Sequence, residues 1–152
     1  MSDRFRQLQR QFHPDNFVLS NDAEQLQSVQ KAAEINDAYQ TLKLPVRRAE
    51  YLLTLSGHDI KSEQTTLKDL DFLMQQMEWR ETLESISDIR DANDELSDFN
   101  KKVRKEHCHY LTLLETQLNA KDWANAADIV RKLKFIDKLR EEILRLEETL
   151  FD

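Results

Sequence analysis

The residues best suited to specific chemistry lie near the start of the chain, where His13, Pro14 and Asp15 follow one another. An imidazole and a carboxylate flank a rigid proline ring there. Asp15 has no further neighbour that would complete a nucleophilic or metal site with it, so catalysis by this segment is not expected. Binding is the better interpretation, because a carboxylate on a stiffened loop can accept a two-pronged charged hydrogen bond from a partner's arginine.

Two predicted helices position these residues. Apolar residues recur at three- and four-residue spacings before the motif, at Phe5, Leu8 and Phe12. They predict a helix over about residues 2–12, and Pro14 should end it at His13. Asn21 and Glu24 then read as a capping box that opens a second helix reaching Leu42. The two helices should form an antiparallel hairpin with the motif at its end.

The first predicted helix is basic. Arg6 and Arg10 are one turn apart, Arg4 lies beside the same surface, and Asp3 is the only acid of the segment. Such a face suits docking of an acidic partner surface next to the loop. A solvated face with no partner is the simpler alternative.

Composition predicts an all-α protein. The 152 residues include one glycine and two prolines, and 34% are charged, which leaves little material for hairpin turns. No apolar run is long enough for a membrane span and no signal peptide is evident, so we expect a soluble cytoplasmic protein. Residues 1–57 are neutral overall and residues 58–152 carry the whole net charge of -7. This acidic second half argues against binding nucleic acid.

A second domain is predicted beyond a polar linker over residues 58–66. A short helix from Pro45 should end near Gly57, the only glycine, acting as its C-cap. Three helices are then expected over about residues 67–87, 93–119 and 122–150. Their short polar connections predict an antiparallel three-helix bundle.

The first bundle helix has two apolar stripes. Phe72, Trp79, Leu83 and Ile86 fall within about 60° of one another, and Leu70, Leu73, Met74 and Met77 are centred about 160° away. A bundle needs one stripe, so the methionine-rich one should be exposed as an interface with Glu78 and Glu81 at its rim. Burial of the helix on both sides is the alternative. Phe135, on the last helix, lies about 85° from that helix's apolar stripe and need not be core.

The run His107, Cys108 and His109 suggests a metal site, which we do not expect. Successive side chains on a helix diverge by about 100°, whereas helical metal ligands are three or four residues apart. His107 falls on the core stripe and should be a hydrogen-bonded interior histidine. A metal-dependent enzyme or sensor that uses these residues with His58 remains the alternative, which elemental analysis would test. The single cysteine excludes an intrachain disulfide.

The motif and its setting resemble the J-domain of DnaJ-type co-chaperones. The resemblance rests on His13-Pro14-Asp15 between two helices and on the run from Glu34 through Ile35-Asn36 to Leu42. Residues 45–53 and 130–139 further resemble the HscB family, the J-type co-chaperones of iron-sulfur cluster assembly. The similarity covers nearly the whole chain, with a J-domain over residues 1–57 and a C-terminal bundle over residues 67–152.

The resemblance implies an adaptor without catalytic residues, metal or cofactor. His13, Pro14 and Asp15, with Arg4, Arg6 and Arg10, would bind a DnaK-type chaperone, HscA, and trigger its ATP hydrolysis. This chain has no glycine-rich phosphate loop, so ATP would bind the partner. The bundle would bind the scaffold protein IscU through Leu73, Met74, Met77, Glu78, Glu81 and Phe135. Neither nucleic acid nor a membrane is an expected partner.

J-domains of this family begin with a further helix and turn ahead of the segment that starts at Met1. We therefore expect a J-domain truncated at its N-terminus, from an internal start or a cut. Its hairpin should be marginal, because Phe5, Leu8 and Tyr39 have less to pack against. A purely structural bundle with an inactive J-like hairpin is the corresponding alternative.

Overall fold

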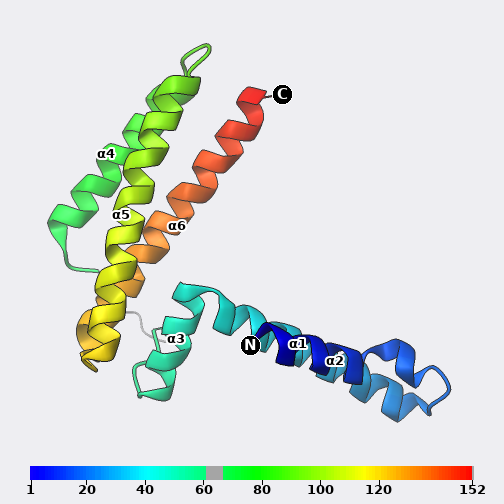
Figure 1. The fold of residues 1–152 in the computed structure, drawn as a ribbon. Coiled ribbons are helices and arrows are strands. Elements are labelled where there is room, and N and C mark those ends of the chain that lie inside the picture. The colour runs from blue at the N-terminus through cyan, green and yellow to red at the C-terminus, as the bar shows by residue number, and fades with distance from the viewer. Residues whose placement is uncertain (61–66, 152) are drawn as a thin grey trace. The chain divides into compact units, whose positions relative to one another are not determined.

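The structure, a computed structural model, describes residues 1–60 and 67–151, and all regular elements within them are helical (Figure 1). In chain order they are α1 (Ser2–Phe12), the 3₁₀ helix η1 (Pro14–Phe17), α2 (Asp22–Lys43), α3 (Pro45–Leu55), α4 (Leu70–Ser87), α5 (Asn93–Asn119) and α6 (Trp123–Phe151). The predicted all-α class is confirmed. None of the described helices is long and apolar enough to cross a membrane.

The chain divides into two compact units, Met1–Tyr51 and Leu52–Asp152, which are described separately. The division falls inside α3, a few residues before the boundary expected at residue 57. Of the predicted linker, residues 61–66 lie outside the described part of the chain. Ile60, within the part that is described, is buried.

In the first unit, α1 and α2 run antiparallel and are joined through η1 (Figure 1). The α1 helix ends where Pro14 predicts, because His13 has extended backbone angles (φ -60°, ψ 132°). Asn21 caps α2 as predicted, its side-chain oxygen accepting the Glu24 N–H at 2.8 Å. The rings of Phe5 and Tyr39 stack with centroids 3.9 Å apart and tie the helices together.

The α3 helix ends in the glycine cap that the sequence predicts. Gly57 has φ +85°, a left-handed conformation that glycine adopts at little cost. The His58 N–H bonds the Leu53 carbonyl at 2.7 Å and the Gly57 N–H bonds the Thr54 carbonyl at 3.1 Å. These two bonds satisfy carbonyl groups that the helix end would otherwise leave unpaired.

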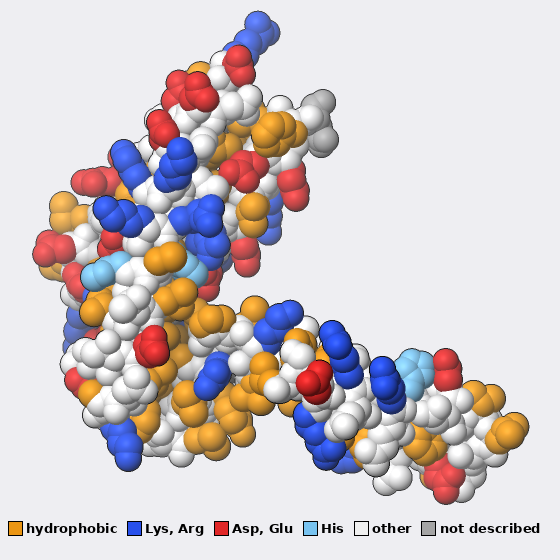
Figure 2. All heavy atoms as spheres, viewed as in Figure 1, with side chains coloured by type: hydrophobic (Ala, Val, Ile, Leu, Met, Phe, Trp, Pro, Cys, Tyr) orange, Lys and Arg blue, Asp and Glu red, His pale blue; other side chains and the backbone are white. Residues whose placement is uncertain are grey.

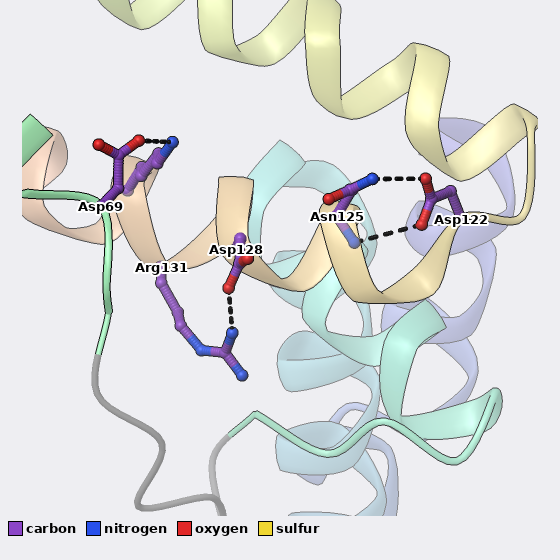
Figure 3. A network of polar contacts seen from close by, with 6 residues as sticks. Asp69, Asp122, Asn125, Asp128 and Arg131 are labelled. Carbon is purple, nitrogen blue, oxygen red and sulfur yellow. Dashed lines mark hydrogen bonds and ion pairs between the residues drawn. The ribbon is translucent and has the colours of Figure 1, made fainter. Parts of the chain in front are cut away.

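In the second unit, the long helices α5 and α6 pair and α4 packs against both (Figure 1). The observed bounds differ from the predicted ones by at most three residues at any end. Asp122 lies just before α6 and accepts the Asn125 N–H at 3.3 Å, as expected of an N-cap (Figure 3). The core draws buried side chains from all three helices, namely Phe72, Leu83, Ile86, Leu96, Phe99, Val103, Ile136, Leu139 and Ile143.

Candidate interaction surfaces

The His13-Pro14-Asp15 loop is a stiff, exposed turn. Pro14 opens η1, and the Asp15 N–H donates to Nδ1 of His13 at 3.2 Å. The side chain of His13 is 57% exposed and that of Asp15 is 86% exposed, with 3.5 Å between Nδ1 and Oδ2. Asn16 ties the turn to α1 by donating from its side-chain nitrogen to the Arg10 carbonyl. The loop therefore presents a carboxylate and an imidazole to solvent from a hydrogen-bonded support.

Two of the three predicted arginines share one depression with this loop. Arg6, Arg10, His13 and Asp15 line an open depression of about 670 Å³, completed by Gln9, Asn16 and Ala32. Figure 2 shows basic side chains beside the histidine of this unit. Within the described part of the chain, neither Arg6 nor Arg10 has an ion-pair partner, so both are available to an acidic surface. We call this site the basic depression.

Arg4 lies apart from the basic depression. It lines a separate, mostly apolar groove of about 440 Å³ between α1 and α2, and it bonds the Gln7 side chain at 3.3 Å. The other lining residues of this groove are Met1, Phe5, Leu8, Glu34, Ile35, Ala38, Tyr39 and Leu42. At about 100° per residue, Arg4 and Arg6 point to opposite sides of α1. Arg6 and Arg10 therefore share the hollow with the loop, and Arg4 does not line it.

The second predicted surface lies on α4. Leu70, Met74 and Met77 are exposed, Met77 to 64%, whereas Phe72, Leu83 and Ile86 are buried. The prediction that one of the two apolar stripes is exposed is confirmed for these residues. Leu73 differs, because it is half-buried and packs against the core. Glu78 and Glu81 are exposed. We call the exposed side chains of Met74, Met77, Glu78 and Glu81, with Leu70, the α4 strip.

Phe135 on α6 adds an aromatic ring near the start of α4. It is 39% exposed and packs edge-on against Phe72 with centroids 6.2 Å apart. Phe72 also meets Tyr110 of α5 edge-on at 5.7 Å. A buried phenylalanine thus links the exposed ring to the bundle core.

An ion pair between Asp69 and Lys132, which we call the clasp, fixes the start of α4 against α6. The Lys132 ammonium donates to Asp69 at 2.7 Å (Figure 3) and lies 5.6 Å from the ring centroids of Phe72 and Tyr110. Asp69 also caps α4 by accepting the Phe72 N–H at 3.1 Å. The hydrogen bond from Lys132, followed by the one from Phe72, holds the pKa of the Asp69 carboxylate below its ordinary value. Neither Asp69 nor Lys132 was predicted, because a contact across 63 residues leaves no local signal.

Two further side chains of α4 bear on how this helix packs in the bundle. Arg80 forms a two-pronged bond with Glu142, at 2.9 and 3.1 Å. Gln76 is 4% exposed, and neither polar atom of its side chain has a hydrogen-bond partner among the residues that the structure describes. A buried amide in this state weakens the contact of α4 with the bundle. The α4 helix is therefore held to α6 by two ion pairs in addition to the apolar packing of Phe72, Leu83 and Ile86.

His107, Cys108 and His109 on α5 differ in burial, as expected for successive residues on a helix. His107 is largely buried, with Nε2 3.0 Å from Asp137 and 3.3 Å from Arg140, which agrees with the predicted interior role. Cys108 and His109 are exposed. Among the residues that the structure describes, no group of three His, Cys, Asp or Glu side chains is arranged to hold a metal ion.

Comparison with known proteins places the whole chain in one family. Residues 68–144 match the family described as "HSCB C-terminal oligomerisation domain". The chain is 59% identical over 152 residues to a Co-chaperone protein HscB homolog of Photobacterium profundum, covering 100% of this chain and 89% of that protein. A protein of the same name from Aeromonas salmonicida is 52% identical, with 100% and 88% covered.

Solved structures agree with the sequence relatives. The fold matches chaperone HscB from Vibrio cholerae with a TM-score of 0.85 and 50% identity, covering 98% of this chain and 87% of that one. It matches human co-chaperone protein HscB with a TM-score of 0.81 and 27% identity, covering 97% and 72%. The chain therefore belongs to the HscB family of co-chaperones.

Proposed function

We propose that this protein is a cytoplasmic co-chaperone of iron-sulfur cluster assembly that stimulates the ATPase of the DnaK-type chaperone HscA and delivers the scaffold protein IscU to it. The observation that carries the proposal is the basic depression, where Arg6 and Arg10 line the same hollow as the rigid His13-Pro14-Asp15 loop. Among the residues that the structure describes, neither arginine has an ion-pair partner. Such a surface suits an acidic partner that offers an arginine to Asp15. Hydrolysis would take place on the partner, with this chain as its activator.

The α4 strip supports the delivery half of the proposal. Methionine side chains adapt to different partner shapes, and a few exposed apolar residues with an acidic rim are typical of a binding surface. Phe135 would supply the aromatic anchor that such interfaces favour. IscU would bind there, in the second unit, while the first unit engages the chaperone.

The test measures both activities on the full chain. Asp15→Asn should remove most of the stimulation of HscA ATP hydrolysis, since an amide cannot form the charged pair, and should leave IscU binding within about twofold of wild type. Met77→Ala combined with Phe135→Ala should weaken IscU binding at least about tenfold through lost apolar contact. That double variant should still stimulate HscA in the absence of IscU.

Two results would contradict this division of labour. Equal loss of both activities in either variant would mean that the two surfaces do not act separately. An HscA rate that is the same with and without the wild-type chain would favour a structural bundle with an inactive hairpin. Elemental analysis of protein purified without chelator tests the metal-sensor alternative, for which a bound metal in stoichiometric amount is the required result.

A further inference from the structure

The connection that follows the His13-Pro14-Asp15 loop displays large apolar side chains that no packing in the hairpin explains. Val18 is 65% exposed and Leu19 is 102% exposed. Leu26 and Val29, in the first turns of α2, are 60% and 52% exposed. Single exposed apolar residues are ordinary, but four within twelve residues of chain are not. We call Val18, Leu19, Leu26 and Val29 the loop patch.

The backbone beneath Val18 and Leu19 is held in place. The side-chain amide of Gln25 donates to the Val18 carbonyl at 3.0 Å and to the Ser20 carbonyl at 3.1 Å. The Ser20 N–H donates to the Phe17 carbonyl at 3.0 Å. The two side chains are thus presented from a fixed support, which reduces the entropy lost when a partner covers them.

The α2 helix carries apolar residues on two faces. Ile35 and Tyr39 face α1, on the same side as the buried Ser28. At about 100° per residue, Leu26 and Val29 point some 100° to 160° away from Ser28. Pairing with α1 accounts for the first face and leaves the second to solvent. Figure 2 shows hydrophobic side chains at the end of the hairpin that carries the histidine.

Val18 and Leu19 of the loop patch lie within the span of an interface centred on Asp15. Val18 follows Asp15 by three positions, so their Cα atoms are at most about 10 Å apart. A typical interface covers about 800 Å² on each partner, a disc about 16 Å in radius. A protein that docks on Asp15 can therefore reach Val18 and Leu19.

We propose that the loop patch is a second, apolar contact for the same DnaK-type chaperone that the basic depression engages. This inference rests on the proposed function. The matching surface on the chaperone is an apolar strip next to the arginine that receives Asp15. Charge would then steer and orient the encounter, whereas burial of Leu19 and its neighbours would hold the complex together.

The experiment titrates the full chain against purified HscA and follows ATP hydrolysis. Val18→Ser combined with Leu19→Ser should raise the concentration for half-maximal stimulation about tenfold, while the maximal rate at saturation stays that of wild type because Asp15 is intact. Leu19→Met keeps an apolar side chain and should remain within about twofold. Leu144→Ser, at a position 57% exposed on α6, is the matched control and should have no effect. Circular dichroism melting checks that all variants stay folded.

The experiment distinguishes failure of this inference from failure of the proposed function. A normal half-maximal concentration for the double serine variant, with Asp15→Asn inactive, would overturn the loop patch and leave the proposed function standing. Full stimulation by Asp15→Asn would overturn both. A third outcome is measured by sedimentation. If wild type dimerises at assay concentrations and the double serine variant does not, the loop patch binds a second copy of this chain and the inference is overturned.

Discussion

A single carboxylate, Asp69, holds together the beginning of α4 and the middle of α6. It accepts one hydrogen bond from the backbone of α4 and one from the Lys132 ammonium, which is largely buried against the rings of Phe72 and Tyr110. The neighbouring Phe135 and Leu70 belong to the candidate IscU surface. The clasp therefore sets the position of α4 residues relative to α6 residues at that surface.

The clasp predicts an acid dependence of stability. The folded-state pKa of Asp69 is lower than its ordinary value of 3.8, so the folded protein favours the charged carboxylate. Its contribution is present above the unfolded-chain pKa and is lost as the pH falls from about 4 through the lower folded pKa. Wild type should therefore melt at a higher temperature than Asp69→Asn at about pH 7, and the difference should shrink below about pH 4 in melts followed by circular dichroism.

Asp98→Asn provides the control for this pH series. Asp98 is exposed on α5 and lies 4.0 Å from Lys101, one helical turn away. Exposed pairs of this kind contribute between zero and about 1 kcal/mol, so the substitution should change melting little at neutral pH. A difference between wild type and Asp69→Asn that stayed constant down to about pH 2.5 would show that the carboxylate charge is not what stabilises the clasp.

At the level of elements, the hairpin and the bundle differ in how much they bury. No residue of α1 is buried and Ser28 is the only buried residue of α2, whereas α6 alone contributes eight buried side chains. Local opening requires less free energy where less apolar surface is buried. The hairpin should therefore open more often than the helices of the bundle.

Hydrogen exchange tests this difference directly. Amide protons in the middle of α1 and α2 should exchange at least about tenfold faster, relative to their intrinsic rates, than those in the middle of α5 and α6. The α5 and α6 amides serve as the internal reference under the same conditions. Equal protection in both units would mean that half-buried contacts such as the Phe5–Tyr39 stack stabilise the hairpin as well as a full core does.

Helix boundaries were predictable because local residues determine them. Pro14 ends α1, Asn21 caps α2 and Gly57 ends α3, each through backbone geometry or a hydrogen bond within a few residues. The exposed face of α4 was predictable from helical spacing for the same reason. The sequence predicts Arg4 beside the surface of Arg6 and Arg10, whereas in the structure Arg4 lines a different groove. The helical angle between Arg4 and Arg6 could have indicated this separation from the sequence alone.

Features that depend on contacts between distant segments could not be predicted. The bond of Lys132 with Asp69 joins residues 63 apart, and the burial of Gln76 depends on how α4 sits on its neighbours. A nearer case is Gln25, whose bond to the Val18 carbonyl seven residues away depends on the irregular path of the chain between η1 and α2. Polar residues with such roles look the same in sequence as polar residues on a solvated face.

Across the whole molecule, the two proposed partner sites differ in the sign of their exposed charge. The basic depression offers arginines that have no ion-pair partner in the described part of the chain, whereas the α4 strip offers methionines with an acidic rim. The net charge of -7 lies entirely beyond residue 57. Exposed charges are screened by salt, whereas apolar contacts are not. The two interactions should therefore respond differently to ionic strength.

Raising the salt concentration from about 50 to about 300 mM should weaken HscA binding about threefold to tenfold and change IscU binding less. Arg6→Gln combined with Arg10→Gln should bind HscA more weakly at low salt and lose most of the salt dependence. Lys102→Gln combined with Lys105→Gln, at exposed positions on α5, removes the same charge elsewhere and should behave as wild type. Fluorescence titrations at both salt concentrations give these values. Identical salt dependence in the two double variants would argue against a role for the arginines.

The side chains of the α4 strip take little part in holding the bundle together. Leu70, Met74 and Met77 point to solvent, while Phe72, Leu83 and Ile86 on the same helix supply the packing. Changes in the strip therefore leave folding nearly untouched, since exposed substitutions alter stability by only about 0.5 kcal/mol. Over evolutionary time, the residues of the α4 strip are therefore free to follow changes in the proposed scaffold partner without endangering the fold that carries them.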